Sequence, residues 1–161
     1  MTAFQWQELP QNLDALKQLP EAGLKTPEET AALTVAALCV YGKDAAACLE
    51  MLAYLKGPAV LTPYEKQFLK DRLNGKEYVP FSYLGGALPA NGYQPAVPYT
   101  VNVEHLPDTE AGYAKVSLHS SGADAPRPVR LRKKESTGQW FLDEQFLLAD
   151  IRIPDSRDPW K

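Results

Sequence analysis

The densest group of chemically active side chains in this sequence is a run of cations from Arg127 to Lys134, where five of eight residues are Arg or Lys. Side chains of an extended strand alternate between its two faces, so Arg130, Arg132 and Lys134 are predicted to share one face. Arg127 lies in the proline-rich approach to that strand. A guanidinium group offers a planar fork of donors that matches carboxylates and phosphates. The surface, with Phe141 from the next predicted strand, is therefore predicted to bind a small anion or an acidic partner protein.

The same cations are also consistent with a solvated sheet face that binds nothing. Antiparallel sheets commonly present one charged face to water, and Glu104, Asp143 and Glu144 could serve as counter-charges. A nucleic-acid interface, with Phe141 stacking on a base, is a third possibility. The formal net charge of -3 and the pI near 5.4 argue against nucleic acid, because such domains usually carry a basic balance. The anion-binding and solvated interpretations both stay open.

Residues 119–124 read His-Ser-Ser-Gly-Ala-Asp, which contains the side-chain types of a catalytic triad. A triad usually draws on distant sequence positions, and His119 and Ser120 would point to opposite faces of a strand. Serine, glycine and aspartate are also ordinary turn residues. No catalytic residue is therefore predicted. The two histidines, His105 and His119, have no ligand spacing such as His-Glu-x-x-His, so neither a metal nor a cofactor is predicted.

A pocket lined by tyrosines is the alternative candidate site. Residues 76–98 form a connection rich in Pro, Gly and Tyr that holds Tyr78, Tyr83 and Tyr93, and Tyr99 follows it. The connection is too apolar for a flexible linker and is predicted to pack over the seam between helices and sheet. A small enzyme with its pocket at this seam is the alternative function. A deep polar pocket with a titrating group would favour the enzyme, and an exposed basic or aromatic patch would favour a binding module.

Length and composition describe an ordinary globular chain. Its 161 residues suffice for one domain with a sizeable core, and 45% hydrophobic with 23% charged residues are typical values. The first residues lack the features of a secretory signal, and no apolar run approaches the roughly 20 residues that span a bilayer. Cys39 and Cys48 are predicted to be buried free thiols. These features predict a cytoplasmic protein with no membrane partner, and they leave its oligomeric state open.

The first part of the chain, residues 1–75, is predicted to be helical. Thr-Pro-x-Glu occurs at Thr26 and again at Thr62. In this pattern threonine caps a helix, proline fits its first position and glutamate completes a capping box. Asp44 is predicted to cap another helix, which stops at Gly57. The predicted helices cover residues 12–19, 27–41, 45–56 and 63–74.

The last part, residues 99–153, alternates apolar and polar residues with period two, which is typical of antiparallel strands with one buried face. Four strands are predicted, and Ile151 with Ile153 is predicted to add a short fifth. The predicted buried face consists of Val101, Val116, Leu118, Val129, Leu131 and Leu142, with Trp140 at its margin. The predicted opposite pairs are Val101 with Val116 or Leu118, Val116 with Leu131, Leu131 with Leu142, Arg130 with Asp143, and Arg132 with Phe141.

Several motifs in the second half are shared with a known family. They are Asn-Gly-Tyr-Gln-Pro from Asn91, Pro-Tyr-Thr-Val from Pro98, the segment from Ser120 to Val129, and Gln-Trp-Phe-Leu from Gln139. They resemble an uncharacterised family of small bacterial proteins, catalogued as a domain of unknown function. The resemblance runs from Thr26 to Ile153. It implies a bacterial cytoplasmic protein with helices followed by a sheet, and it supplies no activity, cofactor or catalytic residue to carry over. In shape, this order is also similar to the cone-shaped α+β folds related to nuclear transport factor 2.

The combined prediction is a single α+β domain over residues 1–161, with N-terminal helices packed on a C-terminal antiparallel β-meander of four or five strands. Residues 1–75 form its helical part, 76–98 the connection and 99–153 the sheet. The predicted function is a non-catalytic binding module that recognises a partner protein or a small anion through the sheet face and its loops.

Overall fold

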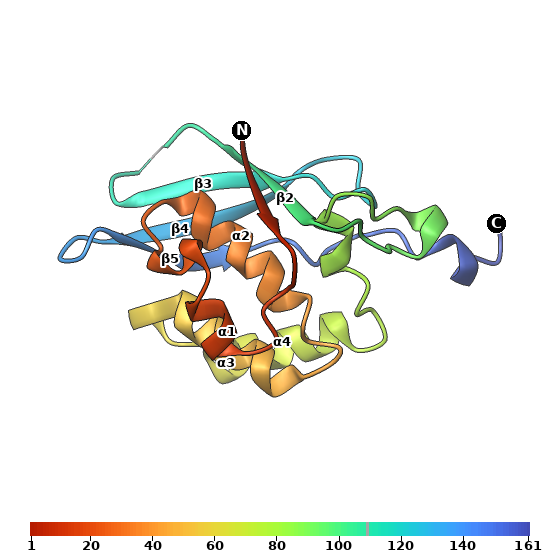
Figure 1. Cartoon of the computed structure of the whole chain (residues 1–161), viewed down its shortest axis with the longest axis horizontal. Coiled ribbons are helices and arrows are strands. Elements are labelled where there is room, and N and C mark those ends of the chain that lie inside the picture. Colours follow the sequence, from red (N-terminus) through yellow and green to blue (C-terminus); the bar gives the residue numbers. More distant parts are fainter. Residues whose placement is uncertain (109) are drawn as a thin grey trace.

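The computed structural model describes residues 1–108 and 110–161 and shows an α+β fold, with helices packed on a five-stranded antiparallel sheet (Figure 1). The strands are β1 (Thr2–Trp6), β2 (Tyr99–His105), β3 (Tyr113–Leu118), β4 (Arg127–Lys134) and β5 (Gln139–Gln145). The α-helices are α1 (Leu13–Lys17), α2 (Pro27–Leu38), α3 (Ala45–Lys56) and α4 (Pro63–Leu73). The predicted fold class is confirmed. Among the described residues, no helix has the length and apolar character needed to cross a membrane.

Both Thr-Pro-x-Glu signals begin helices, as predicted. At the start of α2, the Thr26 hydroxyl oxygen accepts the Glu29 backbone N–H at 3.2 Å, and the Glu29 carboxylate accepts the Thr26 N–H at 3.0 Å. Thr62 and Glu65 make the same reciprocal pair at the start of α4, with both distances 3.1 Å. The Asp44 carboxylate caps α3. Because these oxygens satisfy amide groups that have no partner inside the helix, local sequence is enough to position each helix start.

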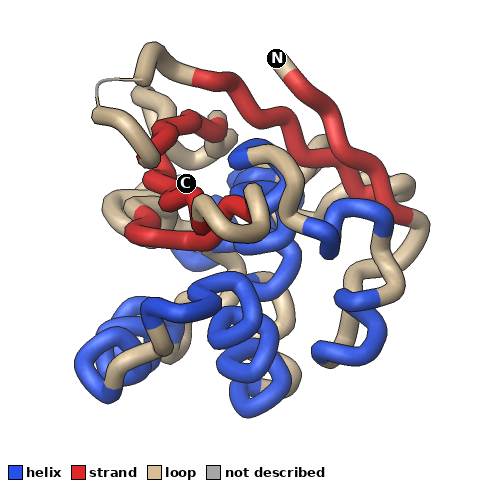
Figure 2. Tube along the Cα trace, turned by 90° about the vertical axis from the view of Figure 1, so that its left-hand side faces the viewer, coloured by secondary structure: helices blue, strands red, loops and turns tan. Residues whose placement is uncertain are grey.

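Helix α2 forms the centre of the core. Every residue from Thr30 to Leu38 is buried, and the helix packs against α3 and all five strands. A helix that is apolar all round needs cover on every side, and the sheet curls over one side of it while helices lie on the other (Figure 2). Its polar side chains are satisfied, since the Thr30 hydroxyl donates to the Trp140 carbonyl at 2.6 Å and Thr34 to the Thr30 carbonyl at 2.8 Å. The helix ends at Leu38, earlier than the predicted Tyr41.

The fifth strand of the sheet comes from the N-terminus, and the prediction of a strand at residues 151–153 is wrong. Strand β1 pairs with β2 at the edge of the sheet, with Phe4 opposite Val101. Residues 151–153 belong to no strand. Their backbone is tied to the loop after β3 by the Arg152 N–H, which donates to the Gly122 carbonyl at 2.9 Å. The short β1 segment pairs with residues far along the chain, so local alternation did not identify it.

The register between β4 and β5 is as predicted up to a β-bulge. The predicted pairs that the structure confirms are Leu131 with Leu142 and Arg132 with Phe141. At the bulge, between Arg130 and Leu131, β5 has one extra residue, and Arg130 pairs with Glu144 instead of the predicted Asp143. A bulge leaves its extra residue outside the ladder. The Asp143 carbonyl accordingly accepts a hydrogen bond from Lys56 Nζ at 2.9 Å.

The register of β3 differs from the prediction by two residues. Val116 lies opposite Val129 instead of Leu131, and Val103 rather than Val101 lies opposite Leu118. A slip of two residues keeps every side chain on the same face, so alternation alone does not detect it. The predicted buried face is confirmed, with all six of its residues 5% exposed or less. Trp140 packs at its margin, as predicted.

Candidate functional site

The face of the sheet that points away from the helices carries most of the cations predicted to bind a partner. Helices α1 to α4 all lie on the other side of the sheet (Figure 1). Lys115, Arg132 and Lys134 are exposed on the open face, and Arg130 is half-buried between them. Lys115 lies directly opposite Arg130 on the neighbouring strand. Strands β3 and β4 therefore bring together three cations that were predicted to bind a partner and Lys115, which was not among the predicted binding residues.

Tyr113 is the aromatic residue of this face, and the sequence analysis missed it. The Arg130 guanidinium carbon lies 4.1 Å from the centroid of the Tyr113 ring, and that of Arg132 lies 5.5 Å from it. Guanidinium groups within about 6 Å of a ring face are attracted by its electrons. Tyr113 is opposite Arg132 because of the β3–β4 register. Since alternation does not determine that register, no local signal identified the stack.

Arg130 already has anionic partners. Its Nη2 donates to Glu110 Oε2 at 2.6 Å, and its Nε lies 3.6 Å from Asp143 Oδ2. Such pairs near the surface contribute little stability, but they reduce the positive charge available at Arg130. The cations of this face that make no ion pair within the described part of the chain are Lys115, Arg132 and Lys134.

Two predicted site residues take part in packing away from the open cations. The Arg127 guanidinium donates to the backbone carbonyls of Ala149 and Asp150 at 3.1–3.3 Å. It thereby ties the segment after β5 to the start of β4. The Phe141 ring packs against Gly57 at the end of α3, on the helical side. Phe141 is opposite Arg132 in register, yet its ring is committed to the seam between α3 and β5.

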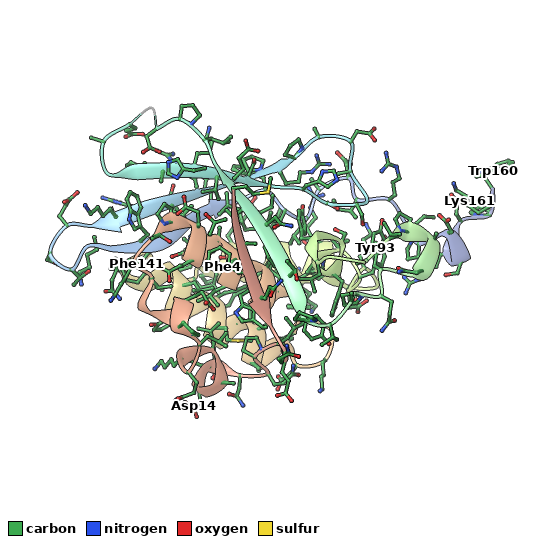
Figure 3. The ribbon with its side chains drawn as sticks, turned by 45° about the horizontal axis from the view of Figure 1, so that its top comes forward. Phe4, Asp14, Tyr93, Phe141, Trp160 and Lys161 are labelled. Carbon is green, nitrogen blue, oxygen red and sulfur yellow. The ribbon has the colours of Figure 1, made fainter. Side chains whose placement is uncertain are left out.

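The four tyrosines of the alternative pocket are not brought into one of the cavities described for this chain. Tyr78 and Tyr93 stack, with ring centroids 5.4 Å apart and planes 7° apart. The hydroxyl groups of Tyr93 and Tyr83 donate to backbone carbonyls after β5, at 2.6 and 2.5 Å, and burial raises the pKa of Tyr83. Tyr99 lines a separate hollow. Figure 3 shows Tyr93 far from Phe141 along the molecule, so these two predicted site residues lie in different regions.

The His-Ser-Ser-Gly-Ala-Asp segment contains no paired histidine and serine. His119 is exposed, whereas Ser120 is fully buried. The Ser120 hydroxyl donates to the Ser82 hydroxyl oxygen at 2.6 Å and accepts the Gly122 backbone N–H at 3.1 Å. These bonds fasten the loop after β3 to residues 80–83, which is a structural role.

His105 ends β2 and links the sheet to α2. Its Nδ1 lies 2.7 Å from Glu28 Oε1, and its Nε2 lies 3.0 Å from Asp108 Oδ1. The hydrogen bond with Glu28 is the main cause of a raised pKa for His105, partial burial opposes the rise, and Asp108 adds to it. Carboxylates on both ring nitrogens stabilise the imidazolium form. His105 therefore forms an ion-pair link between β2 and α2.

A groove between α4 and β5 is the largest of the described hollows, at about 650 Å³, and the sequence analysis did not predict it. Its apolar lining includes Leu61, Tyr64, Phe68, Leu142, Phe146 and Leu148. Tyr64 is 78% exposed and Phe146 is 49% exposed. Tyr64 and Phe68 are four residues apart, which puts both on one side of a helix. That spacing is the only local signal of the groove, because its other wall comes from a distant part of the sequence.

A family model described as Domain of unknown function (DUF6935) matches residues 8–155. The chain belongs to the DUF6935 family. The predicted membership of an uncharacterised family is thereby confirmed. No curated protein and no solved structure matches this chain. The matched residues include all four α-helices and strands β2 to β5, and hence both the cationic face and the groove.

In this member of the DUF6935 family, the buried Lys56 forms an ion pair with Glu65 in the lining of the groove. Lys56 is 6% exposed, and its Nζ donates to Glu65 Oε2 at 2.8 Å and to the Asp143 carbonyl at 2.9 Å. Burial acts to raise the pKa of Glu65, but hydrogen bonds from Lys56 and Thr62, with the charge of Lys56, lower that pKa overall. Buried charges are stable only when paired in this way. Across the residues described, no group of three or more His, Cys, Asp or Glu is arranged to hold a metal ion.

Proposed function

We propose that this chain is a non-catalytic binding module whose open sheet face recognises the carboxylate or phosphate groups of an acidic partner protein or a small anion. One observation carries the proposal. Lys115, Arg132 and Lys134 stand together on a helix-free face and make no ion pair within the described residues. The chain as a whole has a formal net charge of -3. A positive region on an acidic protein directs anionic partners to that region.

Arg132 is the side chain best placed to bind such a group. Its guanidinium carbon lies 5.5 Å from the centroid of the Tyr113 ring, a cation–π contact that restricts the side chain. A side chain that is held before binding loses less conformational entropy on binding. Arg130 is less available because Glu110 and Asp143 already contact it. We therefore expect Arg132, with its neighbouring lysines, to form the centre of the interface.

A charge-reversal pair tests the proposal. The site variant is Arg132→Glu with Lys134→Glu, and the matched control is Lys25→Glu with Lys43→Glu. The control lysines are exposed, have no ion pair among the described residues, and give the same change of net charge. Binding of a fluorescein-labelled oligoglutamate peptide is measured by anisotropy. We expect at least a roughly tenfold loss of affinity for the site variant and less than about twofold for the control.

Equal losses in both variants, or no loss in either, would show that the face is only solvated. Citrate and inorganic phosphate distinguish the two kinds of ligand. Displacement of the peptide by either anion at low concentration indicates a small-anion site. Peptide binding that resists both anions indicates an extended acidic surface of a protein.

The same proposal places this binding module in the bacterial cytoplasm. Cys39 and Cys48 are both free and buried, which supports a compartment where thiols stay reduced. Burial raises the pKa of Cys48 to about 12, so its thiol stays protonated. Immunoblotting of fractionated cells tests the location, and recovery in a secreted or periplasmic fraction would overturn it.

A further inference from the structure

The groove between α4 and β5 has the features of a second interaction surface, independent of the cationic face. Its lining is mainly apolar, and Tyr64 and Phe146 extend that apolar surface onto its rim. Large apolar side chains this exposed in one concave region commonly mark a site of protein interaction. A site for a small molecule would instead enclose most of its ligand. The exposed rim therefore favours a macromolecular occupant.

Val60, the residue before the groove-lining Leu61, has an unusual backbone conformation. Its φ is 59° and its ψ is 139°, and 64% of the residue is exposed. A β-branched residue with positive φ is a genuine outlier. Strain of this kind tends to persist at binding and switch regions. Leu61, the next residue, lines the groove, so the strained backbone directly adjoins its wall.

The occupant does not add a strand to the sheet. Strand β5 is an edge strand, but several of the backbone groups that point away from β4 along it already have partners, which interrupts the row that a new strand would need. The Trp140 N–H donates to the Leu24 carbonyl at 2.8 Å, and the Trp140 carbonyl accepts the Thr30 hydroxyl. The Asp143 carbonyl accepts Lys56 Nζ. Strand addition requires free backbone donors and acceptors, so the occupant must bind through side chains.

The dimensions of the groove suit a helix. Along one wall, α4 contributes lining residues from Tyr64 to Arg72, a length of about 12 Å at 1.5 Å per residue. The other wall runs from Leu142 to Ala149 beside it. Two turns of an amphipathic helix would lay apolar residues at positions i, i+3 or i+4, and i+7 along this length.

The charged residues of the groove lining predict how that helix is oriented. The groove lining includes three acidic residues, Glu65, Asp143 and Glu144, and the cations Lys56 and Arg72. Lys56 pairs with Glu65, and Arg130 lies 3.6 Å from Asp143, whereas Glu144 makes no ion pair within the described residues. We propose that the groove binds an amphipathic helix of a partner protein, with a cationic side chain of that helix placed toward Glu144.

Photo-crosslinking in the host cell identifies the occupant. p-Benzoylphenylalanine replaces Tyr64, and in a matched control it replaces Leu88, which is 50% exposed and outside the groove. Crosslinked peptides are sequenced by mass spectrometry. We expect the probe at position 64, and not the control, to link to a protein segment with helical apolar spacing and a flanking Lys or Arg.

A synthetic peptide of that segment then tests the geometry. We expect Phe146→Asp to weaken its binding by at least about tenfold and Leu88→Asp by less than about twofold. Glu144→Lys should weaken binding by about fivefold, and exchanging the flanking cation of the peptide for glutamate should restore it. Thermal unfolding confirms that each variant is folded.

The proposal is overturned if the probe at position 64 links only to lipid, to a segment without helical spacing, or to the same segments as the control. Binding that is unchanged in Phe146→Asp, or a charge exchange that restores nothing, also overturns it. Phe146→Asp and the probe at position 64 leave the cationic face unchanged. Glu144 lies opposite Arg130 of that face, so binding of the oligoglutamate peptide is also measured for Glu144→Lys.

Discussion

Replacing Gly57 by alanine tests how α3 meets the edge of the sheet. Gly57 has φ 57° and ψ -127°, a combination that other residues rarely adopt. A Cβ added there would also collide with the Phe141 ring. The backbone strain should cost about 1–3 kcal/mol, and forcing the ring to move should cost about 1–3 kcal/mol more. We therefore expect Gly57→Ala to lower the free energy of unfolding by about 2–6 kcal/mol.

Urea unfolding followed by tryptophan fluorescence measures this loss, with Gly92→Ala as the control. Gly92 also has positive φ, at 69°, but a Cβ added there would meet nothing within 4 Å. Gly92→Ala should therefore lower the free energy of unfolding only by the cost of a left-handed backbone, about 1–2 kcal/mol. The difference between the two variants contains the contact with Phe141 and the additional backbone strain at Gly57. Adding Phe141→Leu to Gly57→Ala should recover part of that difference.

Two results would refute this reasoning. If Gly57→Ala and Gly92→Ala lose the same free energy, then the Phe141 ring is not pressed against Gly57. If Phe141→Leu is simply additive with Gly57→Ala, then the two residues are not coupled. Either result would mean that contact between Phe141 and Gly57 does not hold β5 beside α3.

Three further predictions concern stability. Leu131→Ala should lower the free energy of unfolding by about 2–5 kcal/mol, because Leu131 is fully buried; a loss within error in urea titrations would contradict the core assignment. Thr62→Ala should lower the free energy of unfolding by about 0.5–2 kcal/mol, because the cap of α4 is lost. The shift of the unfolding midpoint, followed by far-ultraviolet circular dichroism, measures this loss. Because its bonds with Glu28 and Asp108 raise the pKa of His105 above the ordinary 6.5, its ion pairs stabilise the fold fully below that value and are lost as pH rises through the raised pKa. The wild type should thus lose more stability between about pH 5.5 and 8 than His105→Gln, and identical pH profiles would exclude this link.

Local chemistry in the sequence determined the helix starts and the faces of the strands. Thr26 and Thr62 each cap a helix with side chains three residues away, so these starts need no distant partner. Alternation with period two placed Leu131 inside and Arg132 outside, because successive side chains of a strand point to opposite faces whatever the strand pairs with.

Features that depend on distant partners were decided only by the tertiary structure. The observed register of β3 differs from the predicted one by two residues, which leaves every side chain on its predicted face. This difference places Tyr113 opposite Arg132. Arg127 reads as a surface cation in the sequence, yet the segment after β5 supplies the carbonyls that bind its guanidinium. The groove has one wall from α4 and the other from β5 and the residues after it. Pairings between segments so far apart depend on packing of the whole core, which a local pattern does not encode.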